Sequence, residues 1–161
     1  MIGYNIHKAP PYLLDKINNL FSLLMQKKKE CEQVATTLTN KNLRYTILTL
    51  AQESNQYAHE LSSQISTLGG IPEMEKNREP EWPDEIKNLN DENKILTWCN
   101  KNEKKLIGAY REILNESFLY EELRKMIRYQ LNEMLCAFMQ VKQLCFFKFP
   151  KYAPKLKFEE N

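Results

Sequence analysis

Four glutamates lie beside predicted apolar helix faces, one in each of four long helical segments: Glu30, Glu53, Glu103 and Glu133. Carboxylate-bridged di-iron bundles use one Glu from each of two helices and a Glu-x-x-His from each of the other two. A spacing of three residues puts both ligands on one helical face. In this chain Gln56 follows Glu53 at that spacing, and Cys136 follows Glu133. The four glutamates are therefore candidate metal ligands in a set that lacks both imidazoles.

Three interpretations of these glutamates are open. Charged residues make up 27% of the chain, so a Glu near the core of each helix arises readily by chance. Such acids can reach solvent or pair with the neighbouring cations, which are Lys27, Lys28, Lys104 and Arg128. They can instead hold a divalent ion, because carboxylates without imidazoles suit hard ions such as Mg²⁺ or Ca²⁺. The third interpretation is a polar pocket without metal. We expect ion pairing, no di-iron centre and, at most, a divalent metal ion as cofactor.

The other residue types offer less chemistry. The chain has two histidines, His7 and His59, and its four cysteines form no CxxC pair, so a zinc site is not expected. His59 falls away from the apolar stripe of its helix, and we expect it at the surface. Cys31 and Cys99 fall on predicted core stripes, which indicates reduced, buried thiols in a cytoplasmic protein. Since no Ser-His-Asp set or Gly-rich phosphate loop is present, we predict no catalytic residue.

Apolar residues at helical spacing predict the elements that position these side chains. The clearest stripe consists of Leu43, Ile47, Leu50, Tyr57, Ala58, Leu61, Ile65 and Leu68. Gly69 and Gly70 then supply a left-handed cap, and Pro72 prevents the helix from resuming. Similar patterns predict four helices at about 11–38, 41–68, 91–115 and 118–146.

The connections between these helices define the predicted fold. Short connections make the first two helices one antiparallel hairpin and the last two helices another. Residues 69–90 contain three prolines, many acids and no sustained apolar stripe, which indicates a long crossover. A four-helix bundle with one long crossover has the ferritin-like topology. We therefore predict a single all-α domain over residues 1–161, a ferritin-like four-helix bundle with a long crossover between helices 2 and 3.

Three stretches of the chain resemble a known family. They are LAQESNQYAHELSSQISTLGGIP (50–72), KILTWCNKNEKKLIGAYREIL (94–114) and ECEQVATTLTNKNLRYTIL (30–48). They are similar to the domain of unknown function 2383, a family of ferritin-like bacterial four-helix bundles, and Trp82 falls near a tryptophan expected in the crossover. The resemblance covers roughly residues 13–144 and implies the fold and a bacterial source. It implies the same four glutamates as ligand positions, with departures at Gln56 and Cys136, and no established activity.

The C-terminal segment 147–161 is aromatic, basic and interrupted by proline. Aromatic side chains bury large areas, so we expect this tail to pack on the bundle end or across a homodimer. The alternative is a membrane or nucleic-acid contact through Lys148, Lys151, Lys155 and Lys157. Glu159 and Glu160 dilute that charge, and the net charge of the whole chain is only +2. We therefore predict a homodimer that binds neither nucleic acid nor membrane.

Two functions are compatible with the sequence. The first is a non-enzymatic helical bundle that acts by association, as an interaction or stress-related protein with a degenerate metal site. The second is a carboxylate-based metal-binding bundle or a di-iron-type oxidoreductase. The missing histidines and the aromatic tail favour the first. The two differ in whether the carboxylates converge within the roughly 4–6 Å over which charges strongly perturb one another.

Overall fold

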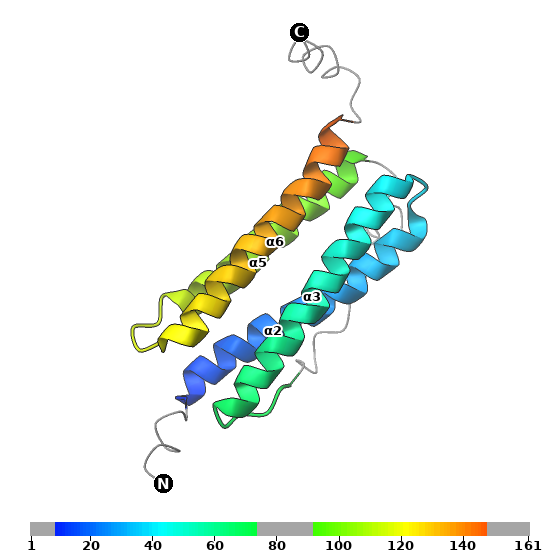
Figure 1. The fold of residues 1–161 in the computed structure, drawn as a ribbon. Helices are drawn as coiled ribbons and strands as arrows, with labels where there is room; N and C mark the ends of the chain where they lie inside the picture. The colour runs from blue at the N-terminus through cyan, green and yellow to red at the C-terminus, as the bar shows by residue number, and fades with distance from the viewer. Residues whose placement is uncertain (1–8, 74–91, 148–161) are drawn as a thin grey trace.

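The computed structural model describes residues 9–73 and 92–147, and within these ranges the chain is all-α. Four helices form a bundle (Figure 1): α2 (Pro11–Thr37), α3 (Lys41–Thr67), α5 (Glu92–Leu114) and α6 (Glu121–Phe147). The prediction of an all-α four-helix bundle is confirmed. The largest difference from the predicted bounds is at α6, which begins at Glu121 and not at residue 118.

Neighbouring helices in the bundle are antiparallel. Helix α2 packs against α3 and α5, and α6 packs against the same two helices. Near the start of α2, Lys16 pairs with Glu116 just beyond the end of α5, whereas Lys27, further along α2, contacts Asn102 near the middle of α5. These contacts show that α2 and α5 run in opposite directions. The two helices within each hairpin are also antiparallel.

The end of α3 and the start of α5 therefore lie at opposite ends of the bundle (Figure 1). The predicted crossover joins two points that are about one helix length apart. Most of that predicted segment, residues 74–91, lies outside the described residues, as does Trp82. The same holds for His7 and for residues 148–161 of the predicted tail.

The predicted stop after α3 forms, but its two glycines act differently. Gly69 has φ 87°, and its N–H donates to the carbonyl of Ser66 while that of Gly70 donates to Ile65, as in a Schellman motif. The predicted left-handed cap is therefore confirmed, with its positive φ at Gly69 and a φ outside that region at Gly70. A Cβ at Gly70 would lie 2.9 Å from Cδ2 of Leu14, so this glycine permits close packing of α2.

Local capping explains where the helices start. Pro11 opens α2 at the first-turn position that tolerates a missing N–H. The side chain of Asn40 accepts a 2.9 Å hydrogen bond from the N–H of Leu43 and caps α3. Arg124 donates to the carbonyls of Leu114 and Glu116, which holds the α5–α6 connection as a turn. This turn delays the start of α6.

The predicted apolar stripes form the core. Cys31 and Cys99 are fully buried, as predicted, and Tyr110 and Phe138 are the largest fully buried side chains. Phe21 and Leu144 pack against this core and are only partly buried. None of α2, α3, α5 and α6, as far as their residues are described, combines the length and apolar character needed to cross a membrane.

Candidate functional site

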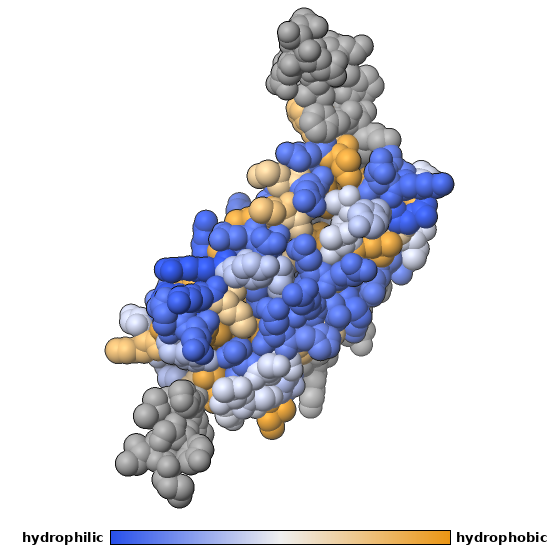
Figure 2. Space-filling view, viewed as in Figure 1, coloured by the Kyte–Doolittle hydropathy of each residue, from blue (hydrophilic) through white to orange (hydrophobic). Residues whose placement is uncertain are grey.

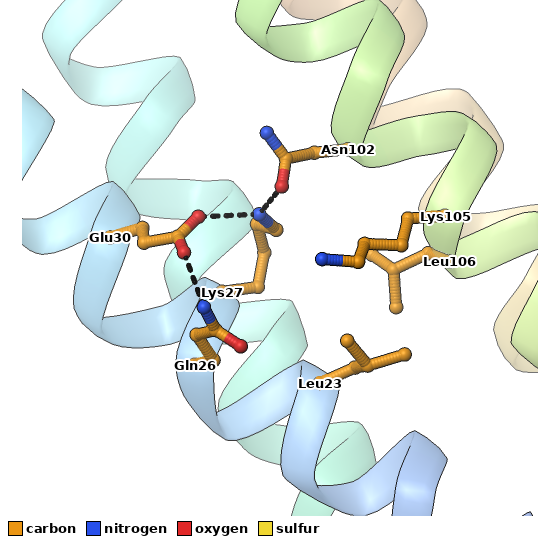
Figure 3. A pocket seen from close by; sticks show the side chains of 7 residues that line it. All are labelled: Leu23, Gln26, Lys27, Glu30, Asn102, Lys105 and Leu106. Carbon is orange, nitrogen blue, oxygen red and sulfur yellow. Dashed lines mark hydrogen bonds and ion pairs between the residues drawn. The ribbon is translucent and has the colours of Figure 1, made fainter. Parts of the chain in front are cut away.

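The candidate ligand Glu30 is neutralised within its own helix. It is 5% exposed, and its Oε1 accepts a 2.6 Å hydrogen bond from Nζ of Lys27, one turn earlier in α2. Its second oxygen, Oε2, accepts from Nε2 of Gln26 at 2.9 Å (Figure 3). Both carboxylate oxygens are therefore engaged by protein donors. Burial of these two charges is tolerable because they are paired and hydrogen-bonded.

Helix α5 supplies the remaining partners of Lys27. The ammonium also donates to Oδ1 of Asn102, and it lies 5.2 Å from the centroid of the Trp98 ring. Asn102 is held by donating its own Nδ2 to the carbonyl of Trp98. An ammonium over an indole face gains from the ring quadrupole, especially when it is desolvated. Lys27 therefore joins α2 to α5 through one charge.

A small cavity of about 30 Å³ adjoins this ion pair. Figure 3 shows its lining, which consists of Leu23, Gln26, Lys27, Glu30, Asn102, Lys105 and Leu106. Drug-sized ligands occupy pockets of roughly 300–1,000 Å³, whereas about 10–15 Å³ holds one water molecule. Oε1 of Gln26 is buried and has no hydrogen-bond partner among the described residues. The cavity therefore suits hydration of this amide and excludes an organic substrate.

The candidate ligand Glu103 is also paired with a lysine. It accepts a hydrogen bond and forms an ion pair with Lys142, which reaches it from α6. The Glu103 side chain is 17% exposed, so it lies at the edge of the α5–α6 seam and not in the bundle centre. This contact joins the two helices of the second hairpin. The prediction that some of these acids pair with cations is confirmed for Glu30 and Glu103. Lys27 was among the expected cations, whereas Lys142 was not.

Glu53 and Glu133 interact across the α3–α6 seam without a lysine between them. Burial raises the pKa of the Glu53 carboxyl above its usual value, and the nearby charge of Glu133 raises it further. Oε2 of Glu53 is buried and finds no hydrogen-bond donor in the described part of the chain. Both side chains are partly exposed. Of the four candidate ligands, these two are the ones without an ion pair to a residue within 9–73 or 92–147.

The four candidate ligands do not form one cluster. Across residues 9–73 and 92–147, no three His, Cys, Asp or Glu side chains gather so as to hold a metal ion. The glutamates are distributed over three seams, with Glu30 at α2–α5, Glu103 at α5–α6, and Glu53 with Glu133 at α3–α6. Gln56 and Cys136, at the two positions where histidines were expected, are exposed on the outer surface. A metal-ligating role for the glutamates remains a prediction.

A buried polar chain that the sequence did not reveal crosses the bundle. The hydroxyl of Tyr110 in α5 donates at 3.0 Å to Oε1 of Gln130 in α6, and both residues are fully buried. Nε2 of Gln130 donates to Glu60 of α3 at 3.0 Å and to the carbonyl of Tyr57 at 3.4 Å. Three helices thus share one glutamine. The sequence gives no signal for this contact, because a lone amide on a helix face does not identify its partners.

The cysteines divide into one exposed and three buried thiols, all of them free. Burial raises the pKa of Cys31 to about 12 and that of Cys99 well above its usual value. Such thiols stay protonated and unreactive at neutral pH. Cys136 is the exposed one, and His59 is exposed as predicted, so neither has the buried, oriented neighbour that nucleophilic catalysis requires.

Charge divides the surface into two contrasting faces. Exposed charged residues are frequent on α2 and α5, namely Asp15, Lys29, Glu32, Lys94, Lys101, Lys104, Lys105, Arg111 and Glu112. On α3 beyond Lys41 and on α6 beyond Arg128, no exposed residue of the described helices is Asp, Glu, Lys or Arg. Figure 2 shows apolar side chains around the C-terminal half of α6 on this second face. We call these exposed parts of α3 and α6 the α3–α6 face.

Comparison of the chain with protein-family models, with curated proteins and with solved structures returns no match. A function must therefore be inferred from the geometry of the side chains and from the chemistry of the surface. Two features bear on it: the lysine pairs at Glu30 and Glu103, and the α3–α6 face, on which no fully exposed residue beyond Lys41 and Arg128 is charged.

Proposed function

We propose that this protein is a non-enzymatic helical bundle that acts by association through its α3–α6 face. The observation that carries the proposal is the absence of exposed Asp, Glu, Lys and Arg from α3 beyond Lys41 and α6 beyond Arg128. Interface centres are depleted of charged residues and enriched in aromatic residues and Met. Tyr45 on α3 and Met139 on α6 are 73% and 58% exposed, and both belong to the residue types that are enriched in interfaces.

The bundle interior supports the same proposal. Lys27 and Lys142 each donate to a glutamate that a metal centre would require as a ligand. A lysine ammonium and a metal cation compete for the same carboxylate oxygens. Replacing metals by lysines converts a catalytic interior into a structural one, and the surface is then the part of the protein that acts.

Native electrophoresis of the full chain in an extract of cells that express it tests this proposal. We expect a complex heavier than the 19.1 kDa chain, and we expect Gln56→Lys with Met139→Lys to release it. The matched control is Gln33→Lys with Asn100→Lys, two exposed positions on the α2 and α5 side. Both pairs add two charges to exposed helix positions. The proposal would be refuted if the unmodified protein migrated as a free chain, or if both double variants lost the complex equally.

A second candidate function is weak binding of a divalent cation by Glu53 and Glu133. It is favoured by the unbonded, buried Oε2 of Glu53 and by the raised pKa of that carboxyl, since a cation would relieve both. Calorimetric titration with Mg²⁺, Ca²⁺ and Mn²⁺ tests it. Binding of one ion that Glu53→Gln removes and Glu103→Gln leaves intact would support this function. Equal binding heat in the unmodified protein, Glu53→Gln and Glu103→Gln would argue against this function.

We also propose the ferritin-like topology and kinship with the family of the domain of unknown function 2383. Antiparallel hairpins whose connecting ends lie a bundle length apart are what that topology requires. We place the protein in the cytoplasm because its four cysteines are free. An experimental structure that traces residues 74–91 along the bundle would support the topology, and a path to another domain would contradict it.

A further inference from the structure

Six exposed residues form a stripe along the outer surface of α6, and we call them the α6 stripe. They are Tyr129, Asn132, Cys136, Met139, Gln143 and Phe146. The spacing alternates between three and four residues over the whole stripe, which is the a and d repeat of a coiled-coil helix. The opposite side of α6 supplies the core of the bundle, for example through Met134 and Val141. The α6 helix therefore has a second seam that points outward.

This seam is suited to packing against another helix. Its members are uncharged, and Tyr129, Met139 and Phe146 are 56%, 58% and 42% exposed. The Tyr129 ring is already held on one side by an edge contact with Tyr57, with 6.3 Å between the ring centroids. Because this ring is already held in place, a partner that covers its exposed half orders it at little further cost in conformational entropy.

The order of residue types along the α6 stripe is symmetric about its centre, the point midway between Ala137 and Phe138. Residues equidistant from that point form three pairs: Tyr129 with Phe146, Asn132 with Gln143, and Cys136 with Met139. The pairs match in chemistry, since the first joins two aromatic rings, the second two amides and the third two sulfur-containing side chains. A helix packed antiparallel to a copy of itself brings these equidistant residues into contact.

We propose that the α6 stripe is a self-association surface, on which a second copy of this chain packs with its α6 antiparallel about a two-fold axis. In such an isologous contact each pair occurs twice, which places aromatic layers at both ends, amide layers inside them and sulfur layers next to the axis. Amides in the facing layers hydrogen-bond to each other, and the rings stack. The lack of charge on the stripe means that two copies meet without repulsion.

This inference deepens the proposed function by naming the partner as a second copy. The stripe is seventeen residue steps long, which is about 26 Å at the helical rise. A seam of this length is small for a stable interface, so we expect a reversible dimer with a dissociation constant in the micromolar range, roughly 1–100 µM. The α3 part of the α3–α6 face stays available to another partner.

Sedimentation of the purified full chain at concentrations on both sides of that range is the first test. We expect a monomer at low concentration and a dimer at high concentration. A monomer throughout would overturn this inference while leaving the proposed function intact, because association in the cell extract would then require a different partner. If the purified chain dimerises but no complex is found in the extract, this inference stands and the proposed function fails.

Two double variants test the orientation. Asn132→Asp with Gln143→Lys places opposite charges in both amide layers of the antiparallel dimer, so we expect dimerisation to persist or strengthen. Asn132→Asp with Gln143→Asp places like charges in the same layers, so we expect the dissociation constant to rise about tenfold or more. In a parallel dimer each residue would meet its own copy, and both variants would weaken association. Weakening by the first variant would therefore overturn the antiparallel arrangement.

A matched control isolates the surface. Gln52→Asp with Ser63→Asp adds two negative charges eleven residues apart on exposed positions of α3, which is the spacing of Asn132 and Gln143 on α6. We expect its dimerisation to match that of the unmodified chain. Circular dichroism of every variant at low concentration checks that the bundle is folded, which exposed positions should permit. Equal weakening by the α3 and α6 variants would refute a dimer made through α6.

Discussion

Nζ of Lys27 lies 2.6 Å from Oε1 of Glu30 in the same helix, and both side chains are almost completely buried. Ion pairs three residues apart usually lie on the solvent side of a helix and contribute little to stability. Here the pair faces α5, where Asn102 accepts from the ammonium and the Trp98 ring lies beneath it. The charge that neutralises the candidate ligand is therefore also the charge that holds two helices together.

Removing one member of this pair should destabilise the bundle strongly. Lys27→Met leaves the Glu30 carboxylate buried without its cation, and such losses cost about 3–5 kcal/mol. Lys27→Met with Glu30→Leu removes both charges and should recover most of that loss, because a buried pair is often no better than apolar packing. Urea unfolding of the two variants measures the difference. If Lys27→Met had the same urea midpoint as the unmodified protein, the ammonium of Lys27 would not stabilise the buried Glu30 carboxylate.

Glu53 should make a contribution to the stability of the bundle that falls as the pH rises through the acidic range. Burial, and then the charge of Glu133, raises the folded-state pKa of Glu53 above its ordinary 4.5. Between 4.5 and the raised value this carboxyl binds more protons in the folded state than in the unfolded state, so its contribution to the unfolding free energy decreases with pH. Glu53→Gln cannot lose a proton and should be more stable than the unmodified protein at pH 7, with the advantage vanishing near pH 4.

Urea midpoints of both proteins across this pH range give the measurement. Glu32→Gln is the control, since Glu32 is exposed and its contact with Lys28 is 3.9 Å long. Exposed pairs of this kind contribute roughly 0–1 kcal/mol, so the control should follow the unmodified curve closely. An advantage of Glu53→Gln that is the same at pH 4 and pH 7 would rule out titration of Glu53 as the cause.

Periodicity determined most of the fold in advance. Because apolar spacing reports which face of a helix is buried, it located all four helices and placed Cys31 and Cys99 in the core. The start of α6 was missed by three residues, since the turn before it depends on Arg124 reaching back to Leu114, a contact that spacing does not encode. The close approach of Leu14 to Gly70 was also not predictable, because the spacing within one helix does not report what packs against the end of another.

The candidate site was predictable only in part. The sequence identified glutamates near the core of every helix, but the rotation of each helix decides which seam a glutamate enters. That rotation placed Glu30 and Glu103 beside lysines and left Glu53 with Glu133. The α6 stripe was detectable from its three-four spacing, but apolar residues of the core stripe dominate the same helix, and exposure distinguishes the two only in the structure.

The buried hydrogen bond between Tyr110 and Gln130 should contribute measurably to stability. Tyr110→Phe leaves Oε1 of Gln130 buried without its 3.0 Å donor, which costs about 1–3 kcal/mol. Tyr45→Phe is the matched control, because Tyr45 is 73% exposed and its hydroxyl can bond to water. Thermal unfolding of the two variants should show a lower melting temperature for the first alone. Equal melting temperatures would mean that Gln130 finds another donor inside the bundle.

The last prediction concerns thiol reactivity. Cys31, Cys99 and Cys145 are fully buried and Cys136 is exposed, so a thiol reagent should modify one of the four cysteines rapidly in the folded protein. The buried thiols react only when the bundle opens, which for an unfolding free energy of about 5 kcal/mol makes them roughly several thousandfold slower. Cys136→Ser should abolish the fast phase, and denaturant should expose every remaining thiol. Because Cys136 lies next to the proposed two-fold axis, dimerisation should cover it, and its modification should slow as the protein concentration rises. A second fast-reacting thiol in the dilute protein would contradict the burial of Cys31, Cys99 and Cys145 in α2, α5 and α6.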